Sequence, residues 1–305
     1  MKSLRIGTRG SPLALWQARH IEKRLREFET GRPVEIVVIE TQGDRAAGDS
    51  LSRIGGEGVF TRAIQDAVLA GEADIAVHSM KDLPTATIAG LTLAAVPERG
   101  PIHDAFVSRK HPRFDDLPAG AKVATGSLRR RAQILHRRPD LCLVDIRGNV
   151  DTRLRKLAQL DLDAIVLAEA GLSRLGLESH ITVLLDVEWM LPAVGQGALG
   201  LECRSDDDGT RAILYSLNHF PSRQAVIAER AILRALGGGC QVPLGVCTQF
   251  TREKSELQIT AAVLSQDGRK RVATSLTGQM DGAEALGNRL AAALLLAGAK
   301  EILLL

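Results

Sequence analysis

The sequence predicts an α/β protein with two similar lobes around a shared cleft, followed by a small α+β domain. Three observations lead to this fold class. Short apolar runs alternate with helical patterns from residue 4 to residue 203. Two strand-to-helix turns, TRGS at residues 8–11 and ATGS at residues 124–127, echo each other. From Ser222 onward the pattern becomes helix, three strands, helix.

The first lobe begins with a strand, LRIGTR, and a helix whose start is marked by Ser11 and Pro12. Serine is a favoured N-cap, and proline suits the first helical position. Apolar residues then recur at helical spacing: Ala14, Ala18, Ile21, Leu25 and Phe28. The further elements expected in this lobe are the strands VEIVVIET, ADIAVHS and LTLAAVP and the helix VFTRAIQDAVLAG.

The second lobe follows a break at residues 97–104 and repeats the alternation. Its expected strands are AFVSR, KVATG, LCLVDI and DAIVLA, and Ser127 is expected to start a helix. Residues 191–203, LPAVGQGALGLEC, form a second glycine-rich crossing that ends in a strand. We interpret the two crossings as hinge strands between the lobes.

Composition narrows the class of protein. A chain of 305 residues suggests two or three domains. It has no run of about eighteen apolar residues that could cross a membrane, and MKSLRIGTRGS lacks the apolar core of a signal peptide. We therefore expect a cytoplasmic protein with no membrane partner. The cysteines show no metal-ligand spacing, so no metal is expected, and Cys142, Cys203 and Cys247 are expected in the core.

The arginines point to an anionic ligand. Of the 39 basic residues 30 are Arg, and several follow strands at turns that start helices. Helix N-termini and the carboxyl ends of parallel strands both favour anions, so these turns predict a cleft for a small polyanion. Helix capping with solvated arginines is the alternative. Aromatic content of 3% and a net charge of +3 argue against nucleic acid.

Two further residues are candidates for chemistry. Asp82 follows a strand in HSMKDLP, where a carboxylate could stabilise a developing positive charge; a surface ion pair is the alternative. Cys240 follows three glycines in GGGCQVPLG, and one glycine would suffice for a helix C-cap. This loop leaves two interpretations open, an attachment point for a covalent group or a loop cysteine without a role.

Six ordered motifs resemble the porphobilinogen deaminase family, also called hydroxymethylbilane synthase. The resemblance extends from about Leu4 through the final helix. The motifs are TRGSPLALWQA, HSMKDLP, TGSLRRRAQ, RGNVDTRL, LPAVGQGALGLECR and GGGCQVPLG.

This resemblance implies a transferase of porphyrin and haem biosynthesis. Such an enzyme condenses four porphobilinogens head to tail with loss of ammonia, and hydrolysis releases hydroxymethylbilane. The chain grows on a dipyrromethane cofactor, whose thioether attachment would be at Cys240. The catalytic aspartate would be Asp82, which would assist loss of the amino group and stabilise the resulting cation.

The resemblance also implies binding residues and domains. The cofactor would contact Lys81, Thr125, Ser127, Arg129, Arg130 and Arg153. The substrate would contact Arg9, Ser11, Gln17, Arg147 and Arg174. The fold implied is two lobes like those of a periplasmic binding protein, with residues 1–98 and 198–218 as domain 1, residues 103–192 as domain 2, and residues 220–305 as domain 3. A monomer is expected.

The chain departs from the family pattern at three places. Glu57 replaces a frequent lysine in a glycine-rich loop, Glu169 replaces a small or apolar residue, and the hinge at residues 100–103 reads GPIH. None of these touches Asp82 or Cys240. The competing hypothesis is a two-lobed binding protein or sensor for a small polyanion, which would need no GGGC loop.

Overall fold

The computed structural model describes residues 3–28, 32–40, 58, 61–237, 242–251 and 255–303. The chain divides into two compact units. The first consists of Met1–Gly100 and Ala198–Arg223, and the second consists of Pro101–Gly197 and Gln224–Leu305. Within the described ranges, no helix combines the length and apolar content that a membrane span requires.

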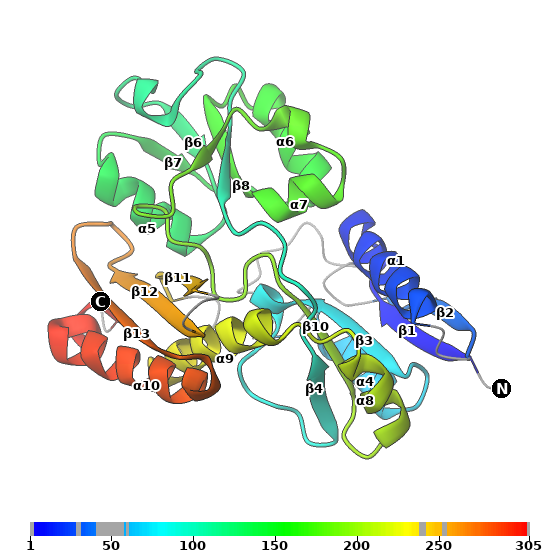
Figure 1. Ribbon diagram of the computed structural model, residues 1–305. Helices are drawn as coiled ribbons and strands as arrows, with labels where there is room; N and C mark the ends of the chain where they lie inside the picture. The colour runs from blue at the N-terminus through cyan, green and yellow to red at the C-terminus, as the bar shows by residue number, and fades with distance from the viewer. Residues whose placement is uncertain are drawn as a thin grey trace. The chain divides into compact units, whose positions relative to one another are not determined.

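The first unit is a five-stranded sheet with helices on both faces (Figure 1). Apolar side chains of α1 and α8 pack with one face of the sheet, and those of α4 pack with the other. Its elements are β1 (Leu4–Thr8), α1 (Pro12–Glu27), β2 (Val34–Val38), α4 (Arg62–Leu69), β3 (Ile75–Ser79), the 3-10 turn η1 (Met80–Asp82), β4 (Leu91–Ala95), β10 (Leu199–Arg204) and α8 (Asp208–Tyr215).

The second unit begins with another five-stranded sheet. Its α5 packs on one face, and α6 and α7 pack on the other. The elements are β5 (Asp104–Val107), η2 (Phe114–Asp116), β6 (Lys122–Ala124), α5 (Leu128–Arg137), β7 (Cys142–Val144), α6 (Val150–Gln159), β8 (Ala164–Ala168), α7 (Glu169–Arg174), η3 (Glu178–His180) and β9 (Val183–Leu185).

The two five-stranded sheets have the same topology. Their strand orders are β2-β1-β3-β10-β4 and β7-β6-β8-β5-β9. In each sheet the first three strands are parallel, and the fourth is antiparallel to both of its neighbours. That antiparallel strand, β10 or β5, is the first strand after a crossing in both cases. The prediction of two similar α/β lobes is therefore confirmed.

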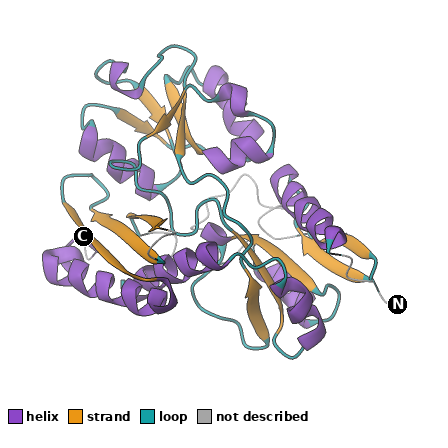
Figure 2. Cartoon of the chain, in the orientation of Figure 1, coloured by secondary structure: helices purple, strands orange, loops and turns teal. Residues whose placement is uncertain are grey.

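The C-terminal part of the chain forms a separate three-stranded antiparallel sheet, β11-β12-β13, with α9 and α10 packed on one face (Figure 2). The predicted order of helix, three strands and helix is confirmed. Its elements are α9 (Phe220–Ala235), β11 (Leu244–Thr251), β12 (Glu256–Leu264), β13 (Arg271–Gln279), η4 (Met280–Gly282), α10 (Ala283–Leu294), the π-helical turn η5 (Leu295–Ala299) and α11 (Lys300–Leu303).

The other face of this small sheet packs on the second lobe. Ala262 and Cys247 of the sheet share an apolar cluster with Ala132 and Leu191. The backbone N–H of Val246 also donates to the carbonyl of Pro192, at 2.8 Å. These contacts place residues 224–305 in one compact unit with residues 101–197. The division of the chain into three domains stays a prediction.

One core expectation was wrong. Cys203 and Cys247 are buried as expected, but Cys142 is exposed. It lies on β7, the edge strand of its sheet, where its side chain points away from the core. An apolar run such as LCLVDI does not reveal which of its alternating positions faces outward when the strand is at an edge.

Close packing of two helices makes Gly287 of α10 a stability test. A Cβ at this position would collide with the carbonyl oxygen of Ala228 in α9 and lie 2.9 Å from the Cβ of Ala231. We expect Gly287→Ala to destabilise the protein by about 1–3 kcal/mol, as over-packing does. Urea unfolding measures this, with Gly282→Ala as the control because a Cβ there meets nothing within 4 Å. Equal stability of the two variants would contradict the packing described.

Candidate active site

The turn between β1 and α1 has the capped geometry that its sequence predicts. Ser11 adopts an extended backbone, and its side chain accepts the N–H of Ala14 at 3.3 Å, so it is the N-cap of α1. Gln17, further along α1, is buried and donates to the hydroxyl of Ser79 at 2.7 Å. This hydrogen bond joins the start of α1 to the end of β3.

Asp82 lies at the end of η1, which directly continues β3. Its side chain is exposed, whereas Met80 at the start of the turn is buried. The Met80 N–H donates to the carbonyl of Ala198 at 3.0 Å, and a Cβ on Gly200 would collide with the Met80 sulfur. Gly200 of the GQGALG motif thus leaves room for Met80, which anchors the turn that presents Asp82.

A cavity of about 70 Å³ in the first unit brings four predicted residues together. Three come from the β1–α1 turn and helix α1, and the fourth is Asp82. Ser79 and His78 of β3 also line this cavity. The predicted residues gathered there are Arg9, Ser11, Gln17 and Asp82.

The equivalent turn of the second lobe lies between β6 and α5. Ser127 is the N-cap of α5, and its side chain accepts the N–H of Arg130 at 3.4 Å. Thr125 is buried, and its hydroxyl accepts the N–H of Ser127 at 3.2 Å. A Cβ on Gly126 would lie 2.8 Å from the carbonyl oxygen of Ile146, so this turn requires glycine.

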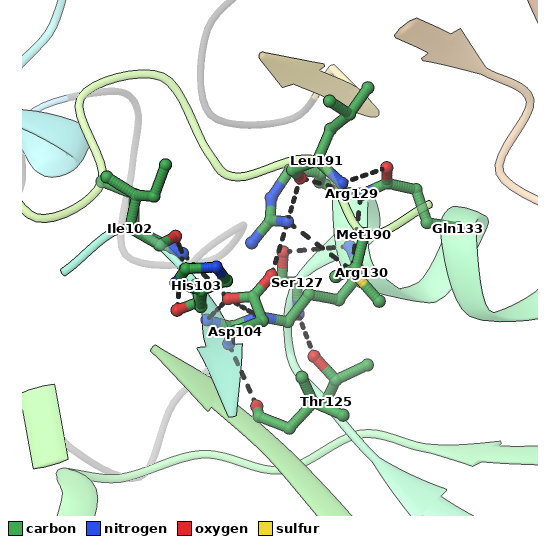
Figure 3. A network of polar contacts seen from close by, with 12 residues as sticks. Ile102, His103, Asp104, Thr125, Ser127, Arg129, Arg130, Gln133, Met190 and Leu191 are labelled. Atoms are coloured by element: carbon green, nitrogen blue, oxygen red, sulfur yellow. Dashed lines mark hydrogen bonds and ion pairs between the residues drawn. The ribbon is translucent and has the colours of Figure 1, made fainter. Parts of the chain in front are cut away.

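Asp104, the first residue of β5, is fully buried between Arg129 and Arg130 (Figure 3). Arg129 donates through Nη1 to Asp104 Oδ2 at 2.7 Å and to the Leu191 carbonyl at 2.6 Å. Arg130 donates through Nε and Nη2 to Asp104 Oδ1 at 3.0 and 2.8 Å. Burial acts to raise the pKa of Asp104, but the charges and hydrogen bonds of the two arginines outweigh it and hold that pKa far below its usual range.

This buried cluster carries a surplus positive charge, because two guanidinium groups share one carboxylate. Burial and the neighbouring Arg130 lower the pKa of Arg129, which Asp104 counteracts. The Nε of Arg129 is buried and has no hydrogen-bond partner among the residues that the structure describes. A surplus charge and an unsatisfied N–H donor both suit a carboxylate ligand.

Gln196 connects the same cluster to both crossings. Its Nε2 donates to Asp104 Oδ1 at 3.0 Å and to the carbonyl oxygens of Ile102 and His103 at 2.7 and 3.3 Å. The first crossing contains Ile102 and His103, and Gln196 lies in the second. The residues that position the two arginines therefore also hold the two crossing segments together.

The remaining predicted arginines lie on separate elements of the second unit. Arg147 forms an ion pair with Asp145 at 3.1 Å, and Arg153 donates to the carbonyl of Gly148 at 2.8 Å. Arg174 donates to the carbonyl of Gly197 at 2.6 Å, and burial lowers its pKa to about 10.

The remaining residues that the sequence singled out are Lys81, Cys240, Glu57 and Glu169. Lys81 lies in η1 beside Asp82 and is half-buried. Cys240 and Glu57 lie outside the described residues. Glu169, at the start of α7, has its Oε2 3.3 Å from Nδ1 of His103, so two departures from the family pattern lie next to each other.

Sequence reasoning missed two residues of these sites, because Asp104 and Gln196 were not singled out. His78 was expected to have a core or surface role; it is buried in β3 and also lines the cavity. The available signal for Asp104 was a carboxylate at the first position of an apolar strand directly after a crossing.

The fold and these sites define a class: a two-lobed α/β protein whose capped strand-to-helix turns carry arginines suited to a small polyanionic molecule. Comparison with known proteins gives the family. Residues 4–212 match the model "Porphobilinogen deaminase, dipyromethane cofactor binding domain", and residues 223–296 match "Porphobilinogen deaminase, C-terminal domain". The chain therefore belongs to the porphobilinogen deaminase family.

Similar proteins that are named porphobilinogen deaminase match nearly the whole chain. It is 48% identical over 302 residues to proteins named porphobilinogen deaminase from Pelobacter propionicus and Geobacter metallireducens. These alignments cover 99% of this chain and 96% and 94% of the relatives. Similar solved structures include a periplasmic substrate-binding protein from Coxiella burnetii, at 17% identity and a TM-score of 0.45, over 74% of this chain and 96% of that one.

Proposed function

We propose that the protein is a transferase that condenses four porphobilinogen molecules head to tail and releases hydroxymethylbilane for tetrapyrrole and haem biosynthesis. Each condensation releases one ammonia. The family match over nearly the whole chain supports this activity. The structural observation that carries it is the cavity in which Asp82 meets Arg9, Ser11 and Gln17.

We propose that Asp82 stabilises the positive charge that develops during the reaction. Asp82 lies on a turn that Met80 anchors, and it lines a cavity together with one cationic residue and two hydrogen-bonding side chains. A carboxylate in this place stabilises the cation that remains when the amino group leaves, and it can accept hydrogen bonds from pyrrole N–H groups. Arg9 and Ser11 are proposed to bind the substrate's carboxylates.

The residues present fit a dipyrromethane cofactor with acetate and propionate side chains. Such a cofactor, when bound, supplies the pyrrole carbon to which the first substrate is joined. The cluster of Asp104, Arg129 and Arg130 offers a surplus positive charge and an unsatisfied N–H to a carboxylate. We propose that Thr125, Ser127, Lys81 and Arg153 also contact the cofactor, and that Arg147 and Arg174 contact substrate.

Cys240 is proposed as the attachment point, through a thioether. It follows α9, which ends at Ala235 and is closed by Gly237 at a φ of 66°. Gly237 alone provides the left-handed residue that a helix C-cap needs. The two glycines that follow it in the sequence are not needed for the cap, and this supports a role for GGGC in attaching a group.

The assay that tests this function measures two products together. Incubation with porphobilinogen should release four ammonia molecules for every hydroxymethylbilane formed. The alternative, a two-lobed binding protein for a small polyanion, predicts binding of porphobilinogen with no ammonia. We further propose a monomer that acts in the cytoplasm without nucleic acid, which sedimentation and cell fractionation test.

Replacement of the proposed attachment residue gives a sharp prediction. Cys240→Ser should yield a protein that gains no stable mass from porphobilinogen, because an alcohol does not replace the thiolate as the nucleophile. Intact mass spectrometry measures this. The matched control is Cys142→Ser, since Cys142 is an exposed thiol on an edge strand and should retain normal loading. A sulfur-linked dipyrrole in Cys240→Ser would refute the assignment.

A further inference from the structure

Gln133 is a buried residue of α5 to which the proposed function gives no role. It ends the TGSLRRRAQ motif and lies four residues after Arg129, on the same face of the helix. Only 2% of Gln133 and 1% of Leu191 are exposed. The amide of Gln133 contacts Leu191, the first residue of the LPAVGQGALGLECR motif (Figure 3). Two of the family motifs therefore meet through this side chain.

The Gln133 amide pairs with both backbone groups of Leu191. The Leu191 N–H donates to Gln133 Oε1 at 2.9 Å, and Gln133 Nε2 donates to the Leu191 carbonyl at 3.0 Å. Nε2 also donates to the Met190 sulfur at 3.5 Å. Leu191 lies between β9 and β10, outside any helix or strand, so its buried backbone groups need partners of this kind. These bonds fix the position of Leu191 relative to α5.

The carbonyl of Leu191 in turn orients Arg129. Arg129 Nη1 donates to this carbonyl at 2.6 Å and to Asp104 Oδ2 at 2.7 Å. Because a guanidinium group is planar, two acceptors on Nη1 restrict the direction of the whole group. Its Nε is buried and has no hydrogen-bond partner in the described part of the chain. The position of Leu191 therefore affects where the N–H group that suits a carboxylate ligand lies.

A glycine from the cysteine-bearing motif packs against the same two residues. Gly245 is the second residue of β11, and a Cβ there would lie 2.6 Å from the Leu191 Cβ and 3.1 Å from Gln133 Oε1. Only a residue without a side chain lets β11 approach Leu191 this closely. We call Gln133, Leu191 and Gly245 the junction. Gly245 follows Cys240 by five residues, so the chain length limits how far the thiol can lie from the junction.

We propose that Gln133 is a positioning residue for attachment of the cofactor, because its contacts with Leu191 hold Arg129 and the start of β11 in one arrangement. This inference rests on the proposed function. In the attachment step a C–S bond forms and a C–N bond of porphobilinogen breaks. The proton of the thiol goes to the amino group, which leaves as ammonia. A group that joins Cys240 and also places a carboxylate at Arg129 must satisfy two anchor points, and preorganised anchor points speed its attachment.

The alternative is that Gln133 only satisfies the buried backbone of Leu191. The surroundings favour the positioning role. Arg129, proposed to bind the cofactor, shares the Leu191 carbonyl with Gln133. The motif that contains Cys240 ends at Gly245, which packs on the same point. The two explanations differ in what they predict for a variant that is still folded.

The first test follows attachment in Gln133→Met, which keeps the length of the side chain and removes both hydrogen bonds to Leu191. Full-length protein free of the two-pyrrole mass is incubated with porphobilinogen, and intact mass spectrometry gives the rate of mass gain. We expect this rate to fall by about tenfold or more, as misplacement of reacting groups does. If Gln133→Met does not fold, Gly245→Ala replaces it, because its Cβ would displace Leu191.

The matched control is Gly287→Ala. It over-packs the same unit, but its Cβ would meet Ala228 and Ala231 of α9 instead of the junction. All rates are compared at a temperature at which each protein is fully folded. A purely structural role of Gln133 would then give Gln133→Met the same rate per folded molecule as Gly287→Ala.

A second measurement separates positioning from local unfolding. Iodoacetamide alkylates free thiols, and peptide mapping compares Cys240 with the exposed Cys142 in the same protein. In the junction variants the alkylation of Cys240 relative to Cys142 should stay close to that of the parent, since the thiol itself is unchanged. Slow attachment together with much faster alkylation of Cys240 would attribute the loss to local unfolding and would overturn the proposal.

The outcomes separate this inference from the proposed function. Slow attachment in a folded variant with an unchanged thiol supports the positioning role. A Gln133→Met rate indistinguishable from that of Gly287→Ala would overturn the role of Gln133 and leave the proposed function intact. A parent protein that gains no mass from porphobilinogen would overturn the proposed function, and this inference with it.

Discussion

Asp82→Asn should fold normally and lose about 10³-fold in kcat, on the scale of electrostatic and acid–base catalysis. The substitution keeps the shape and removes the charge that would stabilise the cation left by the amino group. Asp82 is exposed on η1, so its replacement should have little effect on the free energy of unfolding. Ammonia release from porphobilinogen measures the rate, and urea unfolding measures the stability.

Cofactor content must be measured separately for this variant, since the cofactor is itself made from two substrate units. Intact mass spectrometry gives the loaded fraction, and kcat is expressed per loaded molecule. The matched control is Asp208→Asn, an exposed carboxylate at the start of α8 in the same unit, which should retain full activity. A loaded Asp82→Asn protein with kcat within fivefold of the parent would contradict the catalytic assignment.

The second large effect is a loss of stability expected when Asp104 is replaced. Asp104→Asn should destabilise the protein by about 3–5 kcal/mol, because it leaves two buried guanidinium groups without their shared carboxylate. It should also reduce cofactor loading, since both arginines lose the group that orients them. Urea unfolding and intact mass measure the two effects. The control is Asp116→Asn, whose exposed ion pair with Arg113 should matter little.

The difference in stability between the parent protein and Asp104→Asn should change with pH in a defined direction. The pKa of Asp104 in the folded protein lies far below its ordinary value of 3.8, because the two arginines outweigh burial. Its contribution to stability is therefore present above about pH 4 and is lost as the pH falls from there toward the folded pKa. The stability gap between the parent and Asp104→Asn should shrink as the pH falls from 5 to 2. A constant gap would contradict the role given to Asp104.

Local patterns in the sequence predicted much of the fold. Ser11 and Ser127 were identified as helix starts, and both side chains accept a backbone N–H at the predicted N-caps. The similar strand-to-helix turn found once in each lobe predicted two similar sheets, and the two strand orders match. These features depend on residues that are close together in the chain, so they can be recognised from a single sequence.

The clusters that depend on distant residues could not be predicted in the same way. Asp104 meets Arg129 and Arg130, 25 and 26 residues later, and His78 meets Glu202, more than a hundred residues later. Both pairings arise from strand order and register, which local periodicity does not determine. For the same reason the exposed position of Cys142 was missed, because it depends on β7 being an edge strand.

The most direct test of the account is the intact mass of the purified protein, with peptide mapping around residue 240. We predict an excess that matches two linked pyrrole units, carried by the peptide that contains Cys240. A protein purified without the excess should gain it on incubation with porphobilinogen. A chain that stays unmodified after that incubation and releases no bilane would contradict the proposed function and favour a binding protein.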